Sequence, residues 1–339
     1  MFTVSSTPAR HAIAYATAIF GALAIAAPAW AGDDSNVAGR IDKTLSVKSP
    51  VDVTISTGSG SIEVRPGGDG SIHVVGQIHV SDRWRGDGEV MARVRKLEQE
   101  PPIEQEGSRV RIGDTHDDRT MDHISISYQV TVPAGTALAS NSGSGSQEIG
   151  ALAGPVHASS GSGSLKVGAT GGMVQVGTGS GSITVDGAKE RVEASTGSGS
   201  ITLHQIAGSA KASSGSGSIE LEQTAKGNVD LNTASGHIRI RGANGTLTAG
   251  TASGSMEISG KPDAKWTLSS SSGTISVDVP TGTPFTLDAR TTSGGIDIDH
   301  PLTVSSIHGR HREVHGAVNG GGPTVSIETT SGSIHVGAR

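Results

Sequence analysis

Cysteine is absent from this chain of 339 residues. The absence excludes disulfide bonds, thiolate metal sites and a lipid-bearing cysteine. Aromatic residues make up only 2% of the sequence, although a conventional globular core of this size draws much of its buried area from aromatic rings. The core must therefore be built mainly from aliphatic side chains.

A strong net charge is also lacking. The formal net charge is −6, with acidic and basic residues intermixed, so the sequence shows no basic footprint for nucleic acid. Long apolar runs are missing as well, except for residues 12–27. No segment after that run is apolar enough to cross a bilayer.

The first residues have the pattern of a secretory signal peptide. Arg10 and His11 precede the apolar run, and Ala29-Trp30-Ala31 supplies a small-x-small cleavage site. The run is short for a membrane span, so an uncleaved anchor is the less favoured alternative. We expect residues 1–31 to be removed and the remaining chain to be exported to the periplasm, the cell surface or the medium, without spanning the membrane.

Eleven Ser-Gly pairs, most of them followed by alternating apolar residues, recur along the chain at spacings that become regular from Gly145 onward. From Gly145 to Gly217 the spacing is 18 residues four times running, and it then becomes 19, 18, 19, 21 and 38. A fixed short period indicates stacked supersecondary units. The recurring glycines are Gly60, Gly145, Gly163, Gly181, Gly199, Gly217, Gly236, Gly254, Gly273, Gly294 and Gly332.

Apolar residues alternate with other residues on both sides of each recurring glycine. Around Gly199 they stand at Val192 and Ala194 before it, and at Ile201 and Leu203 after it. The apolar residues stand an odd number of positions before the glycine and an even number of positions after it. Because an unbroken strand cannot change its buried face, the glycine marks a corner between two strands. We predict an all-β parallel β-solenoid (a β-helix), with a right hand favoured and coils of 18–19 residues stacked at about 4.8 Å.

Two residue types recur at the predicted corner. The first glycine of each Gly-Ser-Gly is replaced by Ala, Ser or Thr in later copies, whereas the second never is. The second glycine is therefore predicted to need a positive φ or a close approach of backbone. A Ser or Thr stands three residues before it in every copy, and we expect these hydroxyls to point inward and to bond to one another or to the backbone. Their inward direction disfavours a further alternative, ice or mineral binding through a flat hydroxyl ladder.

Two interruptions of the repeat define the predicted organisation. Residues 32–48 form a linker, residues 49–136 the N-terminal part of the solenoid, and residues 137–339 the Ser-Gly repeat solenoid. Residues 86–99 have helical apolar spacing that stops before Pro101, which predicts a short helical cap or insertion over the open N-terminal end. Residues 299–322 are the second irregular stretch.

The segment at residues 127–136, together with the units that follow it, carries a family resemblance. Its sequence is Ser-Tyr-Gln-Val-Thr-Val-Pro-Ala-Gly-Thr, and serial Ser-Gly-Ser-Gly-Ser-Ile-x-Val units come after it. This pattern resembles the bacterial putative-adhesin family of β-strand-repeat domains of unknown function, over residues 49–339. The resemblance implies a secreted or envelope-facing solenoid and supplies no catalytic residues, so an adhesin role rests on a fold-level analogy.

The C-terminal histidines are the best candidates for a metal site. His308, His311 and His315 would share one face if the segment were helical, which suits a transition metal. Gly309 and Gly316 weaken a helix there. We therefore expect a solvated loop and predict neither a bound metal nor a cofactor.

A second polar cluster, residues 116–118 with Asp122 and His123, has the composition of a calcium loop. Its spacing matches neither the twelve-residue calcium loop nor the calcium-binding nonapeptide repeat. We expect a polar turn at this position.

The alternative function is a polysaccharide lyase or hydrolase, because parallel β-helices also carry such enzymes. A site of that kind needs two or three acids or bases on neighbouring coils. We predict instead a non-enzymatic, adhesin-like protein without catalytic residues, whose partner is an envelope or extracellular protein or glycan. Three residues after each glycine the side chain points outward, and no two acidic residues stand at this position on adjacent middle coils. The residues at this position are Glu63, Glu148, Lys166, Thr184, Thr202, Glu220, Arg239, Glu257, Ser276, Asp297 and His335.

Overall fold

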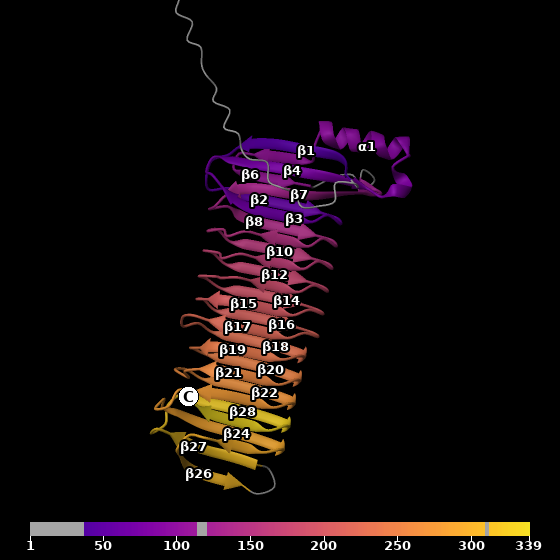
Figure 1. The fold of residues 1–339 in the computed structure, drawn as a ribbon. Helices are drawn as coiled ribbons and strands as arrows, with labels where there is room; N and C mark the ends of the chain where they lie inside the picture. Colours follow the sequence, from indigo (N-terminus) through magenta and orange to yellow (C-terminus); the bar gives the residue numbers. More distant parts are fainter. Residues whose placement is uncertain (1–36, 114–120, 309–311) are drawn as a thin grey trace, which may run out of the picture. The chain divides into compact units, whose positions relative to one another are not determined.

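The structure is a computed structural model that describes residues 37–113, 121–308 and 312–339. The predicted signal peptide at residues 1–31 lies outside the described residues. The described residues belong to one compact unit, Asn36–Arg339. Figure 1 shows this unit as a stack of short strands with one helix, α1, at its N-terminal end. Within the described part of the chain, no helix has both the length and the apolar character needed to span a membrane.

The strands form two sheets, here named sheet A and sheet B. Sheet A contains, in spatial order, β1 (Val37–Ser46), β4 (Ser71–Val80), β7 (Ile124–Pro133), β3 (Ile62–Gly67), β9 (Gln147–Ile149), β11 (Leu165–Val167), β13 (Ile183–Val185), β15 (Ile201–Ile206), β17 (Ile219–Gln223), β19 (Ile238–Ala243), β21 (Met256–Gly260), β23 (Ile275–Val279), β29 (Ile334–Ala338) and β25 (Ile296–Ile298). Sheet B contains β26 (Leu302–His308), β27 (Arg312–Val318), β24 (Phe285–Ser293), β28 (Thr324–Ser331), β22 (Trp266–Ser272), β20 (Leu247–Ser253), β18 (Val229–Ser235), β16 (Ala210–Ser214), β14 (Val192–Thr196), β12 (Val174–Thr178), β10 (Val156–Ser160), β8 (Ala137–Ser142), β2 (Asp52–Thr57), β6 (Arg109–Ile112) and β5 (Ile103–Glu106).

Each regular coil contributes one strand to each sheet, and equivalent residues stack on one another. Val192 of β14 pairs in parallel with Val174 of β12 on one side and with Ala210 of β16 on the other. On the other sheet, Ile201 of β15 pairs with Ile183 and Ile219. This register confirms the parallel β-solenoid that the repeat predicts, and it places the outward side chains of successive coils in columns.

The core consists of aliphatic columns that run between the two sheets. Val192, Ile201 and Leu203 are fully buried, and Ala194 is 4% exposed. Few aromatic rings are needed because each coil buries its small side chains against the coils on either side. Among the described residues, the three largest fully buried side chains are Trp266, Tyr128 and Phe285.

The corner glycine is required by close backbone approach. A Cβ built on Gly199 would lie 2.1 Å from the carbonyl oxygen of Gly181 in the preceding coil and 2.6 Å from its carbonyl carbon. The φ angle of Gly199 lies outside the left-handed region. Of the two reasons that the sequence offers for this glycine, the structure selects close approach.

The hydroxyl column donates to the backbone at the same corner. Thr196 Oγ1 donates a hydrogen bond to the Gly181 carbonyl oxygen at 2.9 Å, and this hydroxyl is the donor that satisfies that carbonyl. In most coils the hydroxyl therefore joins its coil to a neighbouring one and does not bond along the column, whereas Ser270 Oγ has no hydrogen-bond partner among the described residues. The same bond is made by Ser142 to Gly60, Ser160 to Gly145, Thr178 to Gly163, Ser214 to Gly199 and Thr233 to Gly217.

We expect the substitution Thr196→Val to destabilise the protein by about 1–3 kcal/mol, because it leaves the buried Gly181 carbonyl without a donor. Thr196→Ser is the matched control, since it keeps the hydroxyl and Ser already occupies this column at Ser160 and Ser214. Urea denaturation followed by circular dichroism measures both changes. Equal losses of stability in the two variants would show that the hydrogen bond contributes nothing.

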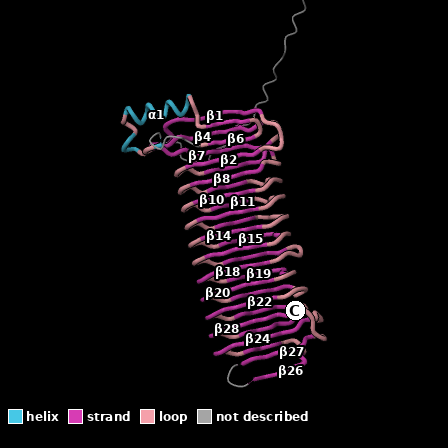
Figure 2. The backbone as a smooth tube through the Cα atoms, turned by 180° about the vertical axis from the view of Figure 1, so that it is seen from behind, coloured by secondary structure: helices cyan, strands magenta, loops and turns pink. Residues whose placement is uncertain are grey.

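The N-terminal end is closed by antiparallel strands and a helix. Residues 37–46, which the sequence assigns to a linker, form β1, and β1 pairs antiparallel with β4. The helix α1 (Gly88–Gln99) begins at Asp87, whose side chain accepts from the backbone N–H groups of Glu89 and Val90. A short 3-10 turn, η2 (Asp82–Trp84), precedes it. Figure 2 shows α1 beside β1, where the backbone N–H of Arg40 donates to Glu98 at 2.9 Å. The structure thus confirms a short helix at this end, close to the predicted bounds.

The C-terminal end departs from the order expected from the repeat. β28 lies between β22 and β24, with Val325 paired to Trp266 on one side and to Leu287 on the other. In sheet A, β29 lies in the same way between β23 and β25. The last coil of the chain is therefore inserted between two earlier coils. The 38-residue spacing contains the hairpin β26–β27, which extends sheet B beyond β24.

Candidate interaction surface

The outward side chains of sheet A form a charged surface over consecutive coils. Because alternate residues of a strand point to opposite faces and the strands pair in parallel register, equivalent outward residues lie in rows across the coils. We name this surface the charged face. It comprises Glu220, His237, Arg239, Arg241, Glu257, Ser259, Ser276, Asp278 and Arg339.

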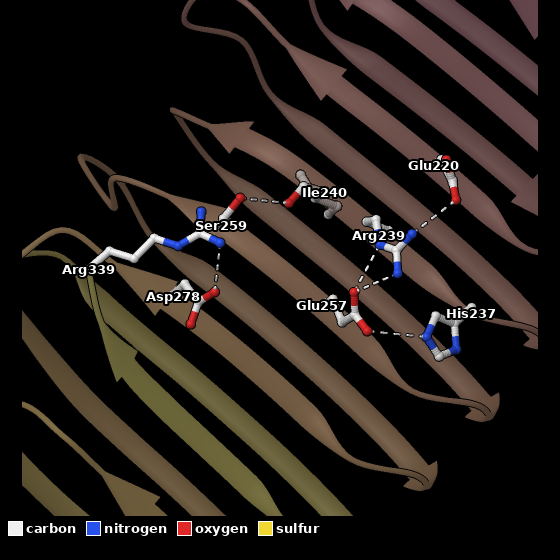
Figure 3. A network of polar contacts seen from close by, with 8 residues as sticks. All are labelled: Glu220, His237, Arg239, Ile240, Glu257, Ser259, Asp278 and Arg339. Atoms are coloured by element: carbon white, nitrogen blue, oxygen red, sulfur yellow. Dashed lines mark hydrogen bonds and ion pairs between the residues drawn. The ribbon is translucent and has the colours of Figure 1, made fainter.

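Arg239 is the centre of the ion-pair network on this face (Figure 3). Its Nε and Nη2 donate to Glu257 Oε2 at 2.9 and 2.8 Å, and its Nη1 lies 3.5 Å from Glu220 Oε1. His237 Nε2 approaches the other oxygen of Glu257 at 3.6 Å. The hydrogen bond from Arg239 is the main cause that holds the pKa of the Glu257 carboxyl below its usual range, and the charges of Arg239 and His237 act in the same direction. The network therefore fixes the long side chains of three adjacent strands.

A hollow of about 460 Å³ adjoins this network. Arg239, Arg241 and Arg339 line it together with Glu257 and Asp278, and Ser259 and Ser276 leave room between the longer side chains. Figure 3 shows Arg339 extending over Asp278, with 3.5 Å between Arg339 Nη2 and Asp278 Oδ2. Arg339 reaches this place because β29 pairs with β23. The hollow therefore depends on the insertion of the last coil.

We expect Arg239→Gln to raise the pKa of Glu257 toward its ordinary value, since the main cause of the lowered pKa is removed. A carboxyl whose pKa is lowered by folding adds stability above its unfolded-state pKa, and this stability is lost as the pH falls through the folded-state pKa. The variant should therefore lose less stability on acidification than the unchanged protein. Carbon-13 NMR titration of the Glu257 carboxyl measures the shift. Lys166→Gln is the control and should leave the Glu257 titration unchanged.

The histidine candidates fall on the hairpin β26–β27 and on residues that are not described, so the solvated loop expected over residues 308–315 is wrong for the ends of this stretch, which are strands. His308 ends β26 and its side chain is not among those described, His311 lies outside the described residues, and His315 lies in β27 opposite Asp288. The segment is strand on both sides of residues 309–311, so the helical spacing that would align the imidazoles is not present in the described residues. In that part of the chain, no group of three or more His, Asp or Glu side chains could hold a metal ion.

Two other histidines near the C-terminus have partners of their own. His335 lies 3.4 Å from Asp297 and 3.7 Å from Asp299. His300 is buried, with Nε2 3.1 Å from the Gly337 carbonyl oxygen and its ring edge against Phe285. Both contacts join the last coil to β25 and the segment that follows it.

The calcium candidate falls largely on residues that are not described. Residues 116–118 lie outside the described residues, whereas Asp122 and His123 are described and exposed. The His123 ring stacks on Trp84, with 4.1 Å between the ring centroids. This contact ties the segment to the turn before α1.

An acidic pair on adjacent coils exists, in the N-terminal part of the stack. Glu63 of β3 and Glu148 of β9 are register partners. Each has a basic partner: Arg65 contacts Glu63, and Lys166 Nζ lies 3.0 Å from Glu148 Oε1. The hydrogen bond and the charge of Glu148 raise the pKa of Lys166. Both carboxylates thus have a cation beside them.

Comparison with known proteins identifies one family model. The model described as Toastrack DUF4097 matches residues 52–337. No curated protein matches the sequence.

Solved structures that match the chain are distant in sequence. A putative lipid binding protein from Parabacteroides distasonis is 14% identical, with 88% of this chain and 96% of that chain covered and a TM-score of 0.32. A putative adhesin from Bacteroides fragilis is 11% identical, with coverage of 88% and 96% and a TM-score of 0.26. A putative cell adhesion protein from Clostridium sporogenes is 10% identical, with coverage of 88% and 100% and a TM-score of 0.18.

Proposed function

The chain belongs to the Toastrack DUF4097 family, and from that premise and the geometry of sheet A we propose that it is an exported, non-enzymatic, adhesin-like protein. Its stacked coils present an interaction surface in the cell envelope or outside the cell. The partner is a protein or glycan of that compartment. The observation that carries the proposal is the charged face, where side chains from consecutive coils are held in place by ion pairs.

Rigid presentation of side chains favours binding. Ordering a long side chain on association costs roughly 0.5–1.5 kcal/mol, and the contacts of Arg239 with Glu220 and Glu257 have already ordered these groups. Charges of both signs in fixed positions contribute mainly to specificity and to the rate of association. An extended face of this kind suits recognition of a large partner.

The chemistry of the same side chains supports a role without catalysis. A general acid that works near neutral pH needs a carboxyl with a raised pKa. The pKa of Glu257 is lowered instead, and the acids of the register pair Glu63 and Glu148 each have a cation beside them. Export is supported by the signal-peptide pattern of residues 1–31.

Binding tests with matched variants examine this proposal. The purified protein is immobilised and exposed to envelope and extracellular fractions of its source organism, beside a variant with Arg239→Gln and Glu257→Gln. The control is Lys211→Gln, which removes an exposed charge from sheet B. We expect the protein and the control to retain the same partner and the charged-face variant to lose it. Equal retention by all three, or release of sugar reducing ends from the fractions that requires one Asp or Glu of the chain, would overturn the proposal.

Export is tested separately. Amino-terminal sequencing of the protein recovered outside the cytoplasm should start at Gly32. A protein found only in the cytoplasm with residues 1–31 attached would contradict export while leaving the binding result intact.

A further inference from the structure

We propose that the hollow on the charged face binds the carboxylate or sulfate group of a sugar in an acidic polysaccharide. This inference rests on the proposed function, because it names the ligand class for the same surface. The group would be held by Arg241 and Arg339, with the Ser276 hydroxyl as a third donor.

Arg241 is an unused donor at the edge of the hollow. Its side chain is exposed, and no described residue forms an ion pair or hydrogen bond with its guanidinium. The other lysine or arginine residues in the described sheet A strands from β9 to β29 are Lys166 and Arg239, and both have carboxylate partners. A guanidinium has five N–H donors and no acceptor, so Arg241 leaves a strong donor set facing this space.

Arg339 and Ser276 add further donors to the hollow. Arg339 is 70% exposed and has a single contact of 3.5 Å with Asp278. The Ser276 hydroxyl has no hydrogen-bond partner among the described residues. Glu257 has both oxygens in contact with Arg239 or His237. A ligand rich in acceptors therefore matches what the protein leaves unsatisfied.

The local charge has the sign that an anion requires. The lining contains three guanidiniums and two carboxylates, whereas the whole chain has a net charge of −6. Arginine is suited to planar carboxylate and tetrahedral sulfate groups because two of its N–H groups can donate in parallel. The side chains that line the hollow thus carry one net positive charge, with the carboxylates of Glu220 and Glu222 beside them on the same face.

The floor of the hollow favours a sugar over an acidic peptide. Ile240 and Ile258 line it, but they are only 1% and 2% exposed. The other lining residues are all charged or carry a hydroxyl, so the hollow presents no exposed, fully apolar side chain to a peptide. A polysaccharide has hydroxyls on both sides of its anionic group, which fits this polar surround.

Binding of defined oligosaccharides tests the inference. Isothermal titration calorimetry of the full protein compares a tetramer of galacturonic acid with its methyl ester, which has the same ring structure without the charge. A sulfated oligosaccharide in a third titration distinguishes sulfate from carboxylate as the preferred group. We expect binding of at least one of the two anionic probes, no binding of the ester, and affinity that falls as salt is raised.

Two variants locate the binding. Arg241→Gln should lower the affinity of the protein for the anionic probe by about tenfold, because a hydrogen bond to a charged group is lost. It should leave the melting temperature unchanged, because Arg241 has no partner among the described residues. Lys211→Gln, with the same change in net charge on sheet B, should bind as the unchanged protein does.

Three outcomes would overturn the inference. They are no binding of either anionic oligosaccharide, binding of the methyl ester as tight as that of the free acid, or an equal loss of affinity in Arg241→Gln and Lys211→Gln. If neither anionic oligosaccharide binds while the charged-face variant still loses its partner in the retention assay, the proposed function stands and this ligand class is wrong. If both fail, the charged face itself is not a binding surface.

Discussion

Deletion of residues 182–199 should yield a folded protein that is one coil shorter, by about 4.8 Å. The deletion removes β13 and β14 and joins Gly181 to Ser200, so the Ser-Gly-Ser corner is kept. The register then allows β12 to pair with β16 and β11 to pair with β15, because these neighbours already stack equivalent residues. Stability in such a stack is close to a sum over coils and their nearest neighbours, so the loss is limited to one coil.

Deletion of residues 191–199 should instead prevent folding. It removes β14 but keeps β13 and β15, so the chain would have to pass from one sheet A strand to the next without crossing sheet B. Soluble yield, circular dichroism and small-angle scattering compare the two deletions. A protein lacking residues 182–199 that is as insoluble as the shorter deletion would contradict a stack of 18-residue coils.

The second large effect is expected from Gly199→Ala. A methyl group at this position overlaps the carbonyl oxygen, the carbonyl carbon and the next nitrogen of the preceding corner, at 2.1, 2.6 and 3.1 Å. Separating the coils locally should cost about 3 kcal/mol or more, at the upper end for overpacked sites. Chemical denaturation measures the loss.

Gly197→Ala is the matched control. Its methyl group meets the Gly179 carbonyl oxygen at 2.6 Å, with the carbonyl carbon at 3.6 Å, and the corresponding position holds Ala234 in a later coil. We expect a loss of about 1 kcal/mol, at the lower end for overpacked sites. If the two alanine variants are equally destabilised, the close approach of backbone at the second glycine is not what restricts this position.

The regular coils could be predicted from the sequence because their contacts follow the period. A residue at a given position in one coil contacts the same position in the coils before and after it, as Val192 contacts Val174 and Ala210. The change of parity at Gly199 then places the corner without any further information. The helix α1 was predictable for a similar reason, since Val90, Val94 and Leu97 are spaced for one buried face.

The two ends were less predictable because their contacts are non-local and outside the period. β1 finds its partner β4 about thirty residues later along the chain, and nothing in its own sequence identifies that partner. At the other end, Gly294 and Gly332 follow each other in the chain, yet the coil of Gly332 lies next to that of Gly273. Both corners have the same Thr-Thr-Ser-Gly sequence, so the sequence does not indicate which of the two coils lies next to the coil of Gly273.

The candidate site was predictable only in its central part. The alternation of Glu220, Arg239 and Glu257 is visible in the sequence, and the structure shows these residues as one network. The contact between Arg339 and Asp278 depends on the inserted coil. The solitary position of Arg241 depends on the directions of its neighbours' side chains, which the repeat does not determine.

The inserted coil also determines when the molecule can finish folding during synthesis. Residues 285–298 leave the ribosome before residues 324–338, yet the later segment must lie between them and residues 266–279. Until it is made, the edge of β22 has no permanent neighbour, and β24 carries the same Ser-Gly corner and can occupy that edge. In the final arrangement this edge belongs to β28 instead. The stack can thus be completed only after residues 324–338 have been synthesised, whatever the state of the earlier coils.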